Sequence, residues 1–255
     1  MPEEKVLFQN LTIIGIGLIG SSLARAARQK GLVGKITVCD INQAHREEAL
    51  RLGICDQATG DFIDAVKNAD HVLICTPPGS CGSVAQAIAP GLQQGCVVSD
   101  VSSVKQSIVH DIIQHLPDGV HFVPTHPIAG TEHSGPSAGF AELFEKRWQI
   151  LTPPAGTNPE AVDRVKRLWE GVGSMVEIMD AQHHDMVLAI TSHLPHLIAY
   201  TIVGTADDLS EHLKQEVIKF SASGFRDFTR IAASDPIMWR DVFLSNKDAV
   251  LEILQ

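Results

Sequence analysis

The 255-residue sequence predicts an α/β protein: an N-terminal doubly wound parallel sheet followed by an all-helical C-terminal domain. Over the first 180 residues, short and continuously apolar runs alternate with helical patterns, which is typical of βαβ units whose sheet is buried on both faces. After residue 180 only helical patterns occur. At roughly 100–200 residues per domain, this length allows one or two domains, and the change of pattern predicts two, residues 1–180 and 181–255.

The apolar runs predict strands at 11–14, 36–39, 71–75, 96–99, 121–124, 148–151 and 175–178. Helical patterns between them cover 19–30, 43–52, 61–68, 80–90, 103–115 and 159–171. In the second domain, helices are expected at 181–206, 208–222 and 236–253. We expect Pro195 to kink the first of these, and Ser234-Asp235-Pro236 is a typical start for the last.

Composition excludes several classes of protein. The chain has 20 Lys and Arg against 30 Asp and Glu, a formal charge of −10, which argues against nucleic acid as a partner. No run approaches about 20 consecutive apolar residues, and the N-terminus lacks a secretory pattern, so neither a membrane partner nor secretion is expected. The five cysteines show no metal-ligand spacing and predict reduced thiols in a cytoplasmic protein; they are Cys39, Cys55, Cys75, Cys81 and Cys96.

The strongest motif is GxGxxG, written here Gly15-Ile16-Gly17-Leu18-Ile19-Gly20, between an expected strand and an expected helix. The first glycine permits a tight turn, the second lets the backbone approach a pyrophosphate, and the third lets helix and strand pack closely. The helix N-terminus, including Leu18 and Ile19, then offers N–H groups to phosphates. An isolated GxGxxG match can be nothing more than a tight turn. The prediction of a Rossmann-type NAD site therefore rests on the order of strand, glycines, helix, second strand and acid.

That acid is Asp40, which ends the second strand 20 residues after Gly20. Its carboxylate can bind the adenosine ribose and would repel a 2′-phosphate, so NAD⁺ is expected over NADP⁺; the alternative is a solvated carboxylate. No cation stands among the three residues that follow Asp40, although His45 and Arg46 come later, on the next helix. Thr76 and Pro77 follow the fourth strand and are expected to shape the cofactor site.

His126 is the candidate catalytic base, because it follows an expected strand and begins the segment HPIAGTE. Pro127 and Gly130 predict a tight loop at the sheet edge that would hold the imidazole rigidly, and imidazole has a near-neutral pKa. The alternative is a structural loop histidine. A hydroxyl in the segment DVSSVK, residues 100–105, could orient the base, although Ser102 could equally be a helix N-cap.

Two further groups lie in the helical domain. The first is a set of polar residues, His183, His184, Asp185, His193 and His196. Pro195 disturbs the helix that would present a His-x-x-His metal pair, so we expect no metal and interpret this set as structural or as a neutral wall for a substrate. The second is the pair Arg226 and Arg230, which could bind an anionic substrate or form surface ion pairs with Asp227 or Asp235.

These residues resemble the prephenate/arogenate dehydrogenases of tyrosine biosynthesis (the TyrA family), most closely the bacterial cyclohexadienyl dehydrogenases. The matching segments are 14–22, 100–105, 126–135, 191–196 and 224–240. The first is generic to dinucleotide binders, whereas HPIAGTEHSG, SHLPH and FRDFTRIAASDPIMWR together are specific. A homodimer built through the helical domain is expected, because that region has apolar helical faces and no sheet to cover them, and closed two-fold dimers are the commonest oligomers. Family members usually continue with further helices beyond the position of Gln255, so the resemblance implies a C-terminus that is shortened here.

The resemblance also implies roles for individual residues. His126 matches the catalytic base, Ser103 the serine that contacts the substrate hydroxyl, and Arg230 the arginine that binds a substrate carboxylate. His196 matches the histidine on the substrate side of the cleft. The residues that line or gate the cleft match Thr131, Glu132, Asp185 and Trp239.

The implied reaction is NAD-dependent oxidative decarboxylation of prephenate to 4-hydroxyphenylpyruvate, of arogenate to tyrosine, or of both, without a metal. Two alternatives remain: another Rossmann-plus-helical dehydrogenase of the β-hydroxyacid type, and a non-enzymatic NAD-sensing module. The first would use a lysine where this sequence has His126 and His196, and a sensor would need neither His126 nor Arg230.

Overall fold

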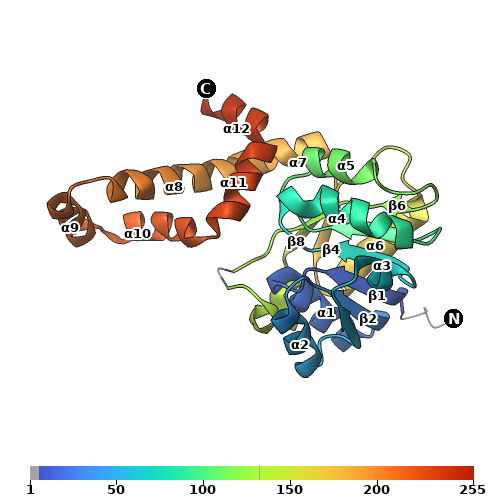
Figure 1. Cartoon of the computed structure of the whole chain (residues 1–255). Helices are drawn as coiled ribbons and strands as arrows, with labels where there is room; N and C mark the ends of the chain where they lie inside the picture. The colour runs from blue at the N-terminus through green and yellow to red at the C-terminus, as the bar shows by residue number, and fades with distance from the viewer. Residues whose placement is uncertain (1–5, 132) are drawn as a thin grey trace. The chain divides into compact units, whose positions relative to one another are not determined.

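The computed structural model describes residues 6–131 and 133–255 and divides into two compact units, residues 1–184 and 185–255. The first unit contains two sheets with their helices, and the second is helical (Figure 1). The predicted α/β class with a helical C-terminal part is therefore confirmed.

The main sheet is entirely parallel, in the order β3-β2-β1-β4-β5-β6. Its strands are β1 (Phe8–Ile14), β2 (Val33–Cys39), β3 (Gln57–Thr59), β4 (His71–Ile74), β5 (Val97–Asp100) and β6 (His121–Phe122). Strand β3 was not predicted, because three residues with no apolar run carry no periodicity. The chain reverses its direction across the sheet between β1 and β4, and ligands of open α/β sheets bind beyond the carboxyl ends of the strands at that point.

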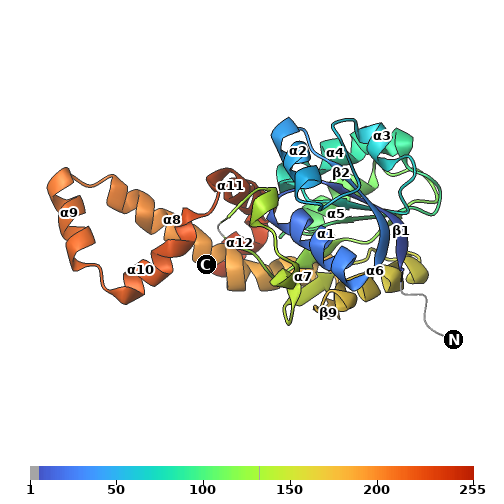
Figure 2. The ribbon, with the colours of Figure 1, turned by 90° about the horizontal axis from the view of Figure 1, so that it is seen from below.

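Helices cover both faces of this sheet (Figure 2). Helices α3, α4 and α5 neighbour one another on one face, and α1 lies on the other face beside α6. Their bounds are α1 (Leu18–Lys30), α2 (Gln43–Arg51), α3 (Phe62–Val66), α4 (Cys81–Ile88), α5 (Gln106–Ile113) and α6 (Pro159–Gly171). Short 3-10 turns occur at Pro78–Ser80, Ala89–Gly91, Pro136–Ala138 and Ala141–Phe144. All six helices were predicted to within a few residues.

The core lies between β1, α1 and α6. Leu11, Ile13, Leu23 and Trp169 are fully buried there, and the Trp169 ring meets Phe144 edge-on at 5.1 Å. Burying a large apolar side chain contributes about 1.5–3 kcal/mol, so this cluster supplies a rigid base for the carboxyl edge of the sheet.

A second, three-stranded sheet corrects one prediction. Strands β7 (Thr125–Pro127), β8 (Trp148–Leu151) and β9 (Met175–Ile178) follow in that order, with β7 antiparallel to β8. Strand β6 ends at Phe122, so the strand expected at 121–124 was too long. His126 is not in a tight loop, because it pairs with Ile150 in the antiparallel ladder.

The remaining elements are helical: α7 (Ala181–Leu188), α8 (Leu194–Asp207), α9 (Glu211–Phe220), α10 (Ser223–Thr229), a 3-10 turn (Arg230–Ala233), α11 (Pro236–Ser245) and α12 (Lys247–Leu254). A π-helical turn, Ala189–His193, joins α7 to α8. Pro195 cannot donate a helical hydrogen bond, which explains the irregular turn where a kink was expected. The predicted helix 236–253 is broken at Asn246, whose φ of −115° and ψ of 26° leave the helical region.

The continuous helix over 181–207 is 27 residues long and apolar enough to cross a membrane by length and composition, and only 22% of its most apolar window is buried. The sequence analysis predicted a helix at 181–206 but not its high average hydropathy, because His193, His196 and the hydroxyl residues interrupt every run of consecutive apolar residues. A single such helix is weak support for a membrane protein.

Candidate active site

The glycine motif forms the turn between β1 and α1. Gly15 has a φ of +90°, and a Cβ placed there would lie 2.9 Å from the Cys75 carbonyl oxygen. A Cβ on Gly20 would lie 2.5 Å from the Gly15 carbonyl oxygen. A Cβ on Gly17 would meet nothing within 4 Å. Gly15 and Gly20 are therefore required for packing, whereas Gly17 keeps space open above the turn.

Helix α1 begins with an uncapped positive end. Gly17 is its N-cap and no side chain accepts the first backbone N–H groups. The first turn, which starts at Leu18 and Ile19, holds no acidic residue, while Arg28 and Lys30 stand in the last turn. The N–H groups and the helix dipole together favour an anion at this end.

Asp40 stands beside this turn at the end of β2. Its Oδ2 accepts the Ile16 N–H at 3.0 Å and its Oδ1 accepts the Asn42 N–H at 2.8 Å. The carboxylate is 11% exposed. Arg46 folds back from α2, and its Nη1 donates to the Asp40 carbonyl oxygen at 2.7 Å. Arg46, which the sequence places on the next helix, thus returns to the end of β2 and contacts the Asp40 backbone.

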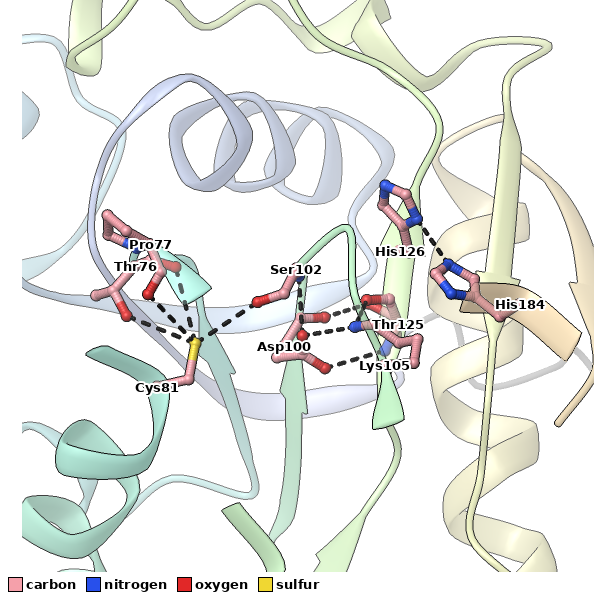
Figure 3. Close-up of polar contacts among 9 residues, drawn as sticks. All are labelled: Thr76, Pro77, Cys81, Asp100, Ser102, Lys105, Thr125, His126 and His184. Carbon is pink, nitrogen blue, oxygen red and sulfur yellow. Dashed lines mark hydrogen bonds and ion pairs between the residues drawn. The ribbon is translucent and has the colours of Figure 1, made fainter. Parts of the chain in front are cut away.

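The segments after β4 and β5 meet beside Cys81 (Figure 3). The Cys81 thiol lies 3.9 Å from Thr76 Oγ1 and 3.5 Å from Ser102 Oγ, and it contacts the Pro77 carbonyl oxygen at 3.6 Å. Burial raises the pKa of this thiol to about 11, so it stays protonated and unreactive at neutral pH. Ser102 is not a helix cap, because α5 begins only at Gln106.

A buried ion pair joins the end of β5 to β7 (Figure 3). Lys105 Nζ lies 2.6 Å from Asp100 Oδ2 and donates to the Thr125 carbonyl oxygen at 2.7 Å, and both charged side chains are fully buried. Asp100 Oδ2 also accepts the Ser102 N–H, and the Thr125 hydroxyl donates to the Asp100 carbonyl oxygen. Breaking a buried pair by removing one partner costs about 3–5 kcal/mol, so this network fixes the residue next to His126.

His126 follows that anchor and is paired with a second histidine. Its Nδ1 lies 2.9 Å from His184 Nε2, and the two rings meet edge-on with centroids 5.1 Å apart (Figure 3). Both side chains are buried, at 8% and 0% exposure. In Figure 3 the His126 Nε2 atom points away from His184. The sequence analysis interpreted His184 with its neighbours as structural or as part of a substrate wall, and it could not connect His184 to His126 because spacing alone does not tell which histidine of the pair 183–184 faces inward.

Three further predicted residues belong to the first unit, Ser103, Thr131 and Glu132. Ser103 is half-buried beside Ser102. Thr131 is exposed and its Oγ1 accepts the His133 N–H at 3.3 Å. It helps to line a hollow of about 300 Å³, together with Ile128, Phe140, Glu142 and Arg147 among others. Glu132 lies outside the described residues.

In the second unit, His196 stacks on Trp239 with ring centroids 3.6 Å apart and planes inclined by 16°. His196 Nδ1 donates to the Ser192 carbonyl oxygen at 2.8 Å. Burial lowers the pKa of His196 and outweighs this hydrogen bond, which favours the neutral ring. The Trp239 indole N–H is buried and has no hydrogen-bond partner within the described residues. This stack presents a flat, neutral surface.

His193 and Asp185 are fastened differently. The Asn246 side-chain amide donates to His193 Nδ1 at 2.9 Å and to the Asp185 carbonyl oxygen at 2.8 Å. Asn246 thereby ties the start of α12 to the π-helical turn. Within residues 6–131 and 133–255, no three His, Cys, Asp or Glu side chains come together as a metal site.

Arg226 and Arg230 are both exposed. Neither forms an ion pair with Asp227 or Asp235 in the described part of the chain. The Asp235 carboxylate instead caps α11, accepting the backbone N–H groups of Ile237 and Met238.

Two family models cover almost all of the chain. The model described as prephenate dehydrogenase, nucleotide-binding domain, matches residues 23–178, and prephenate dehydrogenase, dimerization domain, matches residues 180–255. The chain belongs to the prephenate dehydrogenase family. It is an oxidoreductase whose first unit holds the nucleotide-binding domain, and the resemblance drawn from the sequence is confirmed.

Named relatives agree with this assignment. The chain is 43% identical to the cyclohexadienyl dehydrogenase of Zymomonas mobilis, over 97% of this chain and 84% of that protein. It is 38% identical to the prephenate dehydrogenase of Bacillus subtilis, over 95% and 65% respectively. Among solved structures, it resembles Aquifex aeolicus prephenate dehydrogenase in complex with hydroxyphenyl propionate and NAD⁺, with a TM-score of 0.89, 39% identity, and coverage of 96% of this chain and 85% of that one.

Proposed function

We propose that this prephenate dehydrogenase family member oxidises prephenate, arogenate or both with NAD⁺ and releases CO₂ in the same reaction. The observation that carries the proposal is the buried pair His126–His184, which is anchored through Thr125 to the carboxyl end of β5. That end lies at the edge of the sheet where the glycine motif opens α1. A proton acceptor and a dinucleotide cradle thus share one edge.

The residues present fit NAD⁺. The open space at Gly17 admits a pyrophosphate, and the uncapped start of α1 offers it N–H groups. Asp40 keeps a carboxylate next to the turn, where it can accept hydrogen bonds from the adenosine ribose. When bound, NAD⁺ supplies the acceptor for the hydride.

His126 serves as the base. When His126 Nδ1–H donates to His184 Nε2, the lone pair of His126 lies on Nε2, the nitrogen that points away from His184 (Figure 3). That nitrogen takes the proton of the substrate's ring hydroxyl as hydride leaves C4. His184 then accepts a stronger, charge-assisted hydrogen bond from the resulting imidazolium. Ser103 is the hydroxyl that contacts the reacting oxygen.

Loss of CO₂ needs no further catalytic group. Oxidation at C4 creates a ketone that is conjugated to the ring carbon bearing a carboxylate. The electrons of the breaking C–C bond flow into that carbonyl, the carbonyl oxygen takes up a proton, and the ring becomes aromatic. Arg230 binds a substrate carboxylate, and His196 with Trp239 provides a flat wall for the ring. Thr131, Glu132 and Asp185 line or gate this cleft.

Purified protein mixed with NAD⁺ and prephenate, and separately with arogenate, tests this function through NADH absorbance. We expect NADH from at least one substrate. The protein with His126→Asn is the matched control and should bind NAD⁺ while producing NADH much more slowly. Absence of NADH with both substrates would contradict the proposal.

We also propose that the protein is a cytoplasmic homodimer joined through its dimerization domain. The second unit exposes apolar side chains along several helices, including Ile190, Ile218, Phe220, Ile237 and Leu244. A hollow of about 280 Å³ between α8, α9 and α10 is lined by apolar and threonine side chains. A second copy of the chain is the occupant we propose for this surface, because closed two-fold dimers are the commonest oligomers. Light scattering that finds an active monomer at micromolar concentration would refute it.

A further inference from the structure

Asn246 stands at the break between α11 and α12 and is the N-cap residue of α12. Asparagine is favoured at this position because its side chain can accept one of the first backbone N–H groups of the helix. The Asn246 side chain makes no such bond. It is 4% exposed and instead bonds to Asp185 and His193, on the chain before α8. Capping therefore does not explain why an asparagine stands here.

The two contacts of the Asn246 amide determine which of its atoms is the nitrogen. The atom 2.8 Å from the Asp185 carbonyl oxygen is the nitrogen, because a carbonyl oxygen can only accept. The same nitrogen lies 2.9 Å from His193 Nδ1. An amide nitrogen donates two hydrogens and accepts none, so His193 Nδ1 is the acceptor. The fully buried His193 ring therefore carries its hydrogen on Nε2.

His193 in turn meets Trp239, the ring on which His196 stacks. The centroids of the His193 and Trp239 rings are 6.1 Å apart and the ring planes are inclined by 76°, the edge-on arrangement that aromatic rings favour. The His196 and Trp239 centroids are 3.6 Å apart. His193 is also the last residue of the π-helical turn, a rare element that frequently occurs at functional sites. Contacts thus run without a gap from Asn246 to the stacked rings.

We propose that Asn246 is a positioning residue for the substrate: its amide fixes the His193 ring, and His193 holds Trp239 with its stacked His196 in the orientation that receives the substrate's ring. This inference rests on the proposed function of the stack as a wall for that ring. Asn246 acts through His193 and does not itself touch the substrate. The bond to the Asp185 carbonyl oxygen holds the amide in place while its second hydrogen points at His193 Nδ1.

Asn246→Asp is the test variant, because aspartate has the same shape as asparagine but no N–H group to donate. Its oxygens would face the Asp185 carbonyl oxygen and would draw a hydrogen onto His193 Nδ1. We expect the KM for prephenate to rise about 5–20-fold, in the range of one or two neutral hydrogen bonds. The wall binds substrate and transition state alike, so kcat should stay within about threefold of wild type, and the Kd for NAD⁺ should not change.

Two further variants separate positioning from a merely structural role. Val250 is a buried residue of α12, and Val250→Ala loosens the packing of that helix without removing a hydrogen bond of the Asn246 side chain. It should lower Tm and leave the KM for prephenate unchanged. His193→Phe keeps a ring but removes Nδ1. Adding Asn246→Asp to His193→Phe should change KM by less than about twofold, because the effect of Asn246 passes through His193.

Two measurements need no turnover. Long-range proton–nitrogen NMR spectra show which nitrogen of a histidine carries hydrogen, and His193→Phe identifies the His193 signal by its loss. Wild type should show the Nε2–H form at neutral pH, and Asn246→Asp should not. Calorimetric titration with 4-hydroxyphenylpyruvate in the presence of NAD⁺ should show the same order of weakening as KM. A wild-type protein that binds this compound but forms no NADH would contradict only the proposed reaction.

Four results would overturn the inference. The first is a wild-type His193 that carries its hydrogen on Nδ1. The second is a wild-type KM and a wild-type affinity for 4-hydroxyphenylpyruvate in Asn246→Asp. The third is an equal rise of KM in Val250→Ala, which would make the effect one of helix packing. The fourth is a full additional loss when Asn246→Asp is combined with His193→Phe, which would show that Asn246 does not act through His193.

Discussion

Replacing His184 tests whether the second histidine positions the base. While both rings are neutral, the 2.9 Å hydrogen bond between His126 Nδ1 and His184 Nε2 is worth about 0.5–1.5 kcal/mol. Once His126 holds the substrate proton, the same bond is charge-assisted and is worth about 1.5–3 kcal/mol. The difference of about 1–1.5 kcal/mol stabilises the transition state and corresponds to roughly 10-fold in kcat.

His184→Leu removes this difference and also frees His126 to place its proton on either nitrogen. We expect kcat to fall about 10–100-fold with the KM for NAD⁺ unchanged. His184→Gln is the matched control, because its amide reaches about as far as Nε2 and can still accept from Nδ1–H. It should keep kcat within about fivefold of wild type.

The assay is steady-state NADH formation with saturating prephenate, accompanied by thermal melts of each variant. Wild-type kcat in His184→Leu would show that the contact with His184 does not support catalysis. Equal losses of kcat in His184→Leu and His184→Gln, with equal losses of thermal stability, would show that His184 acts only through packing.

Three other predictions follow from single residues. Arg230→Ala should raise the KM for prephenate about 10–100-fold, since it removes a charge-assisted carboxylate contact worth about 1.5–3 kcal/mol. The affinity for NAD⁺ should stay unchanged. Steady-state kinetics in which prephenate and NAD⁺ are varied in turn check both expectations. Gly17→Ala should weaken NAD⁺ binding without lowering Tm, whereas Gly20→Ala should lower Tm, because its Cβ would lie 2.5 Å from the Gly15 carbonyl oxygen; calorimetric titration and thermal melts separate the two. Burial, with a smaller contribution from the nearby Arg164, lowers the pKa of His71 to about 3. Below about pH 6.5, His71 therefore binds a proton in the unfolded chain but not in the folded chain. This difference should lower the free energy of unfolding by about 2 kcal/mol between pH 7 and pH 5, as measured by urea titration.

Each of these predictions has a result that would contradict it. A KM within about twofold of wild type in Arg230→Ala would assign that arginine to the surface. Unchanged NAD⁺ affinity in Gly17→Ala would show that the pyrophosphate does not bind against the turn at Gly17. His71→Gln should reduce the loss of unfolding free energy between pH 7 and pH 5. His212→Gln, at an exposed position, is the control and should leave that loss unchanged. The opposite pattern would mean that His71 takes up its proton in the folded state.

Much of the fold could be predicted because its signals are local. Continuous apolar runs mark the buried strands, and β8 and β9 coincide with the predicted ranges. The packing reasons for Gly15 and Gly20 follow from the motif itself. Strand β7 could not be predicted, since a three-residue strand containing a proline has no periodicity and is defined as a strand by its pairing with the distant β8.

The side-chain contacts of the site could not be predicted from the sequence, for a different physical reason. Arg46 follows Asp40 by six residues and returns to it only because α2 folds back across the end of β2. His184 meets His126 across 58 positions, which no spacing rule connects. The helix at 181–206 was predicted, but its high average hydropathy was not recognised, because scattered polar residues interrupt its apolar runs.

The most direct test of the central claim is one reaction followed by two products. Wild-type protein with NAD⁺ and prephenate should release CO₂ and NADH in equal amounts, and His126→Asn should lower kcat for both about 10²–10⁴-fold while the Kd for NAD⁺ stays unchanged. If prephenate and arogenate both yield no NADH, if NADH forms without CO₂, or if His126→Asn turns over at the wild-type rate, then His126 is not the base of an oxidative decarboxylation in this protein.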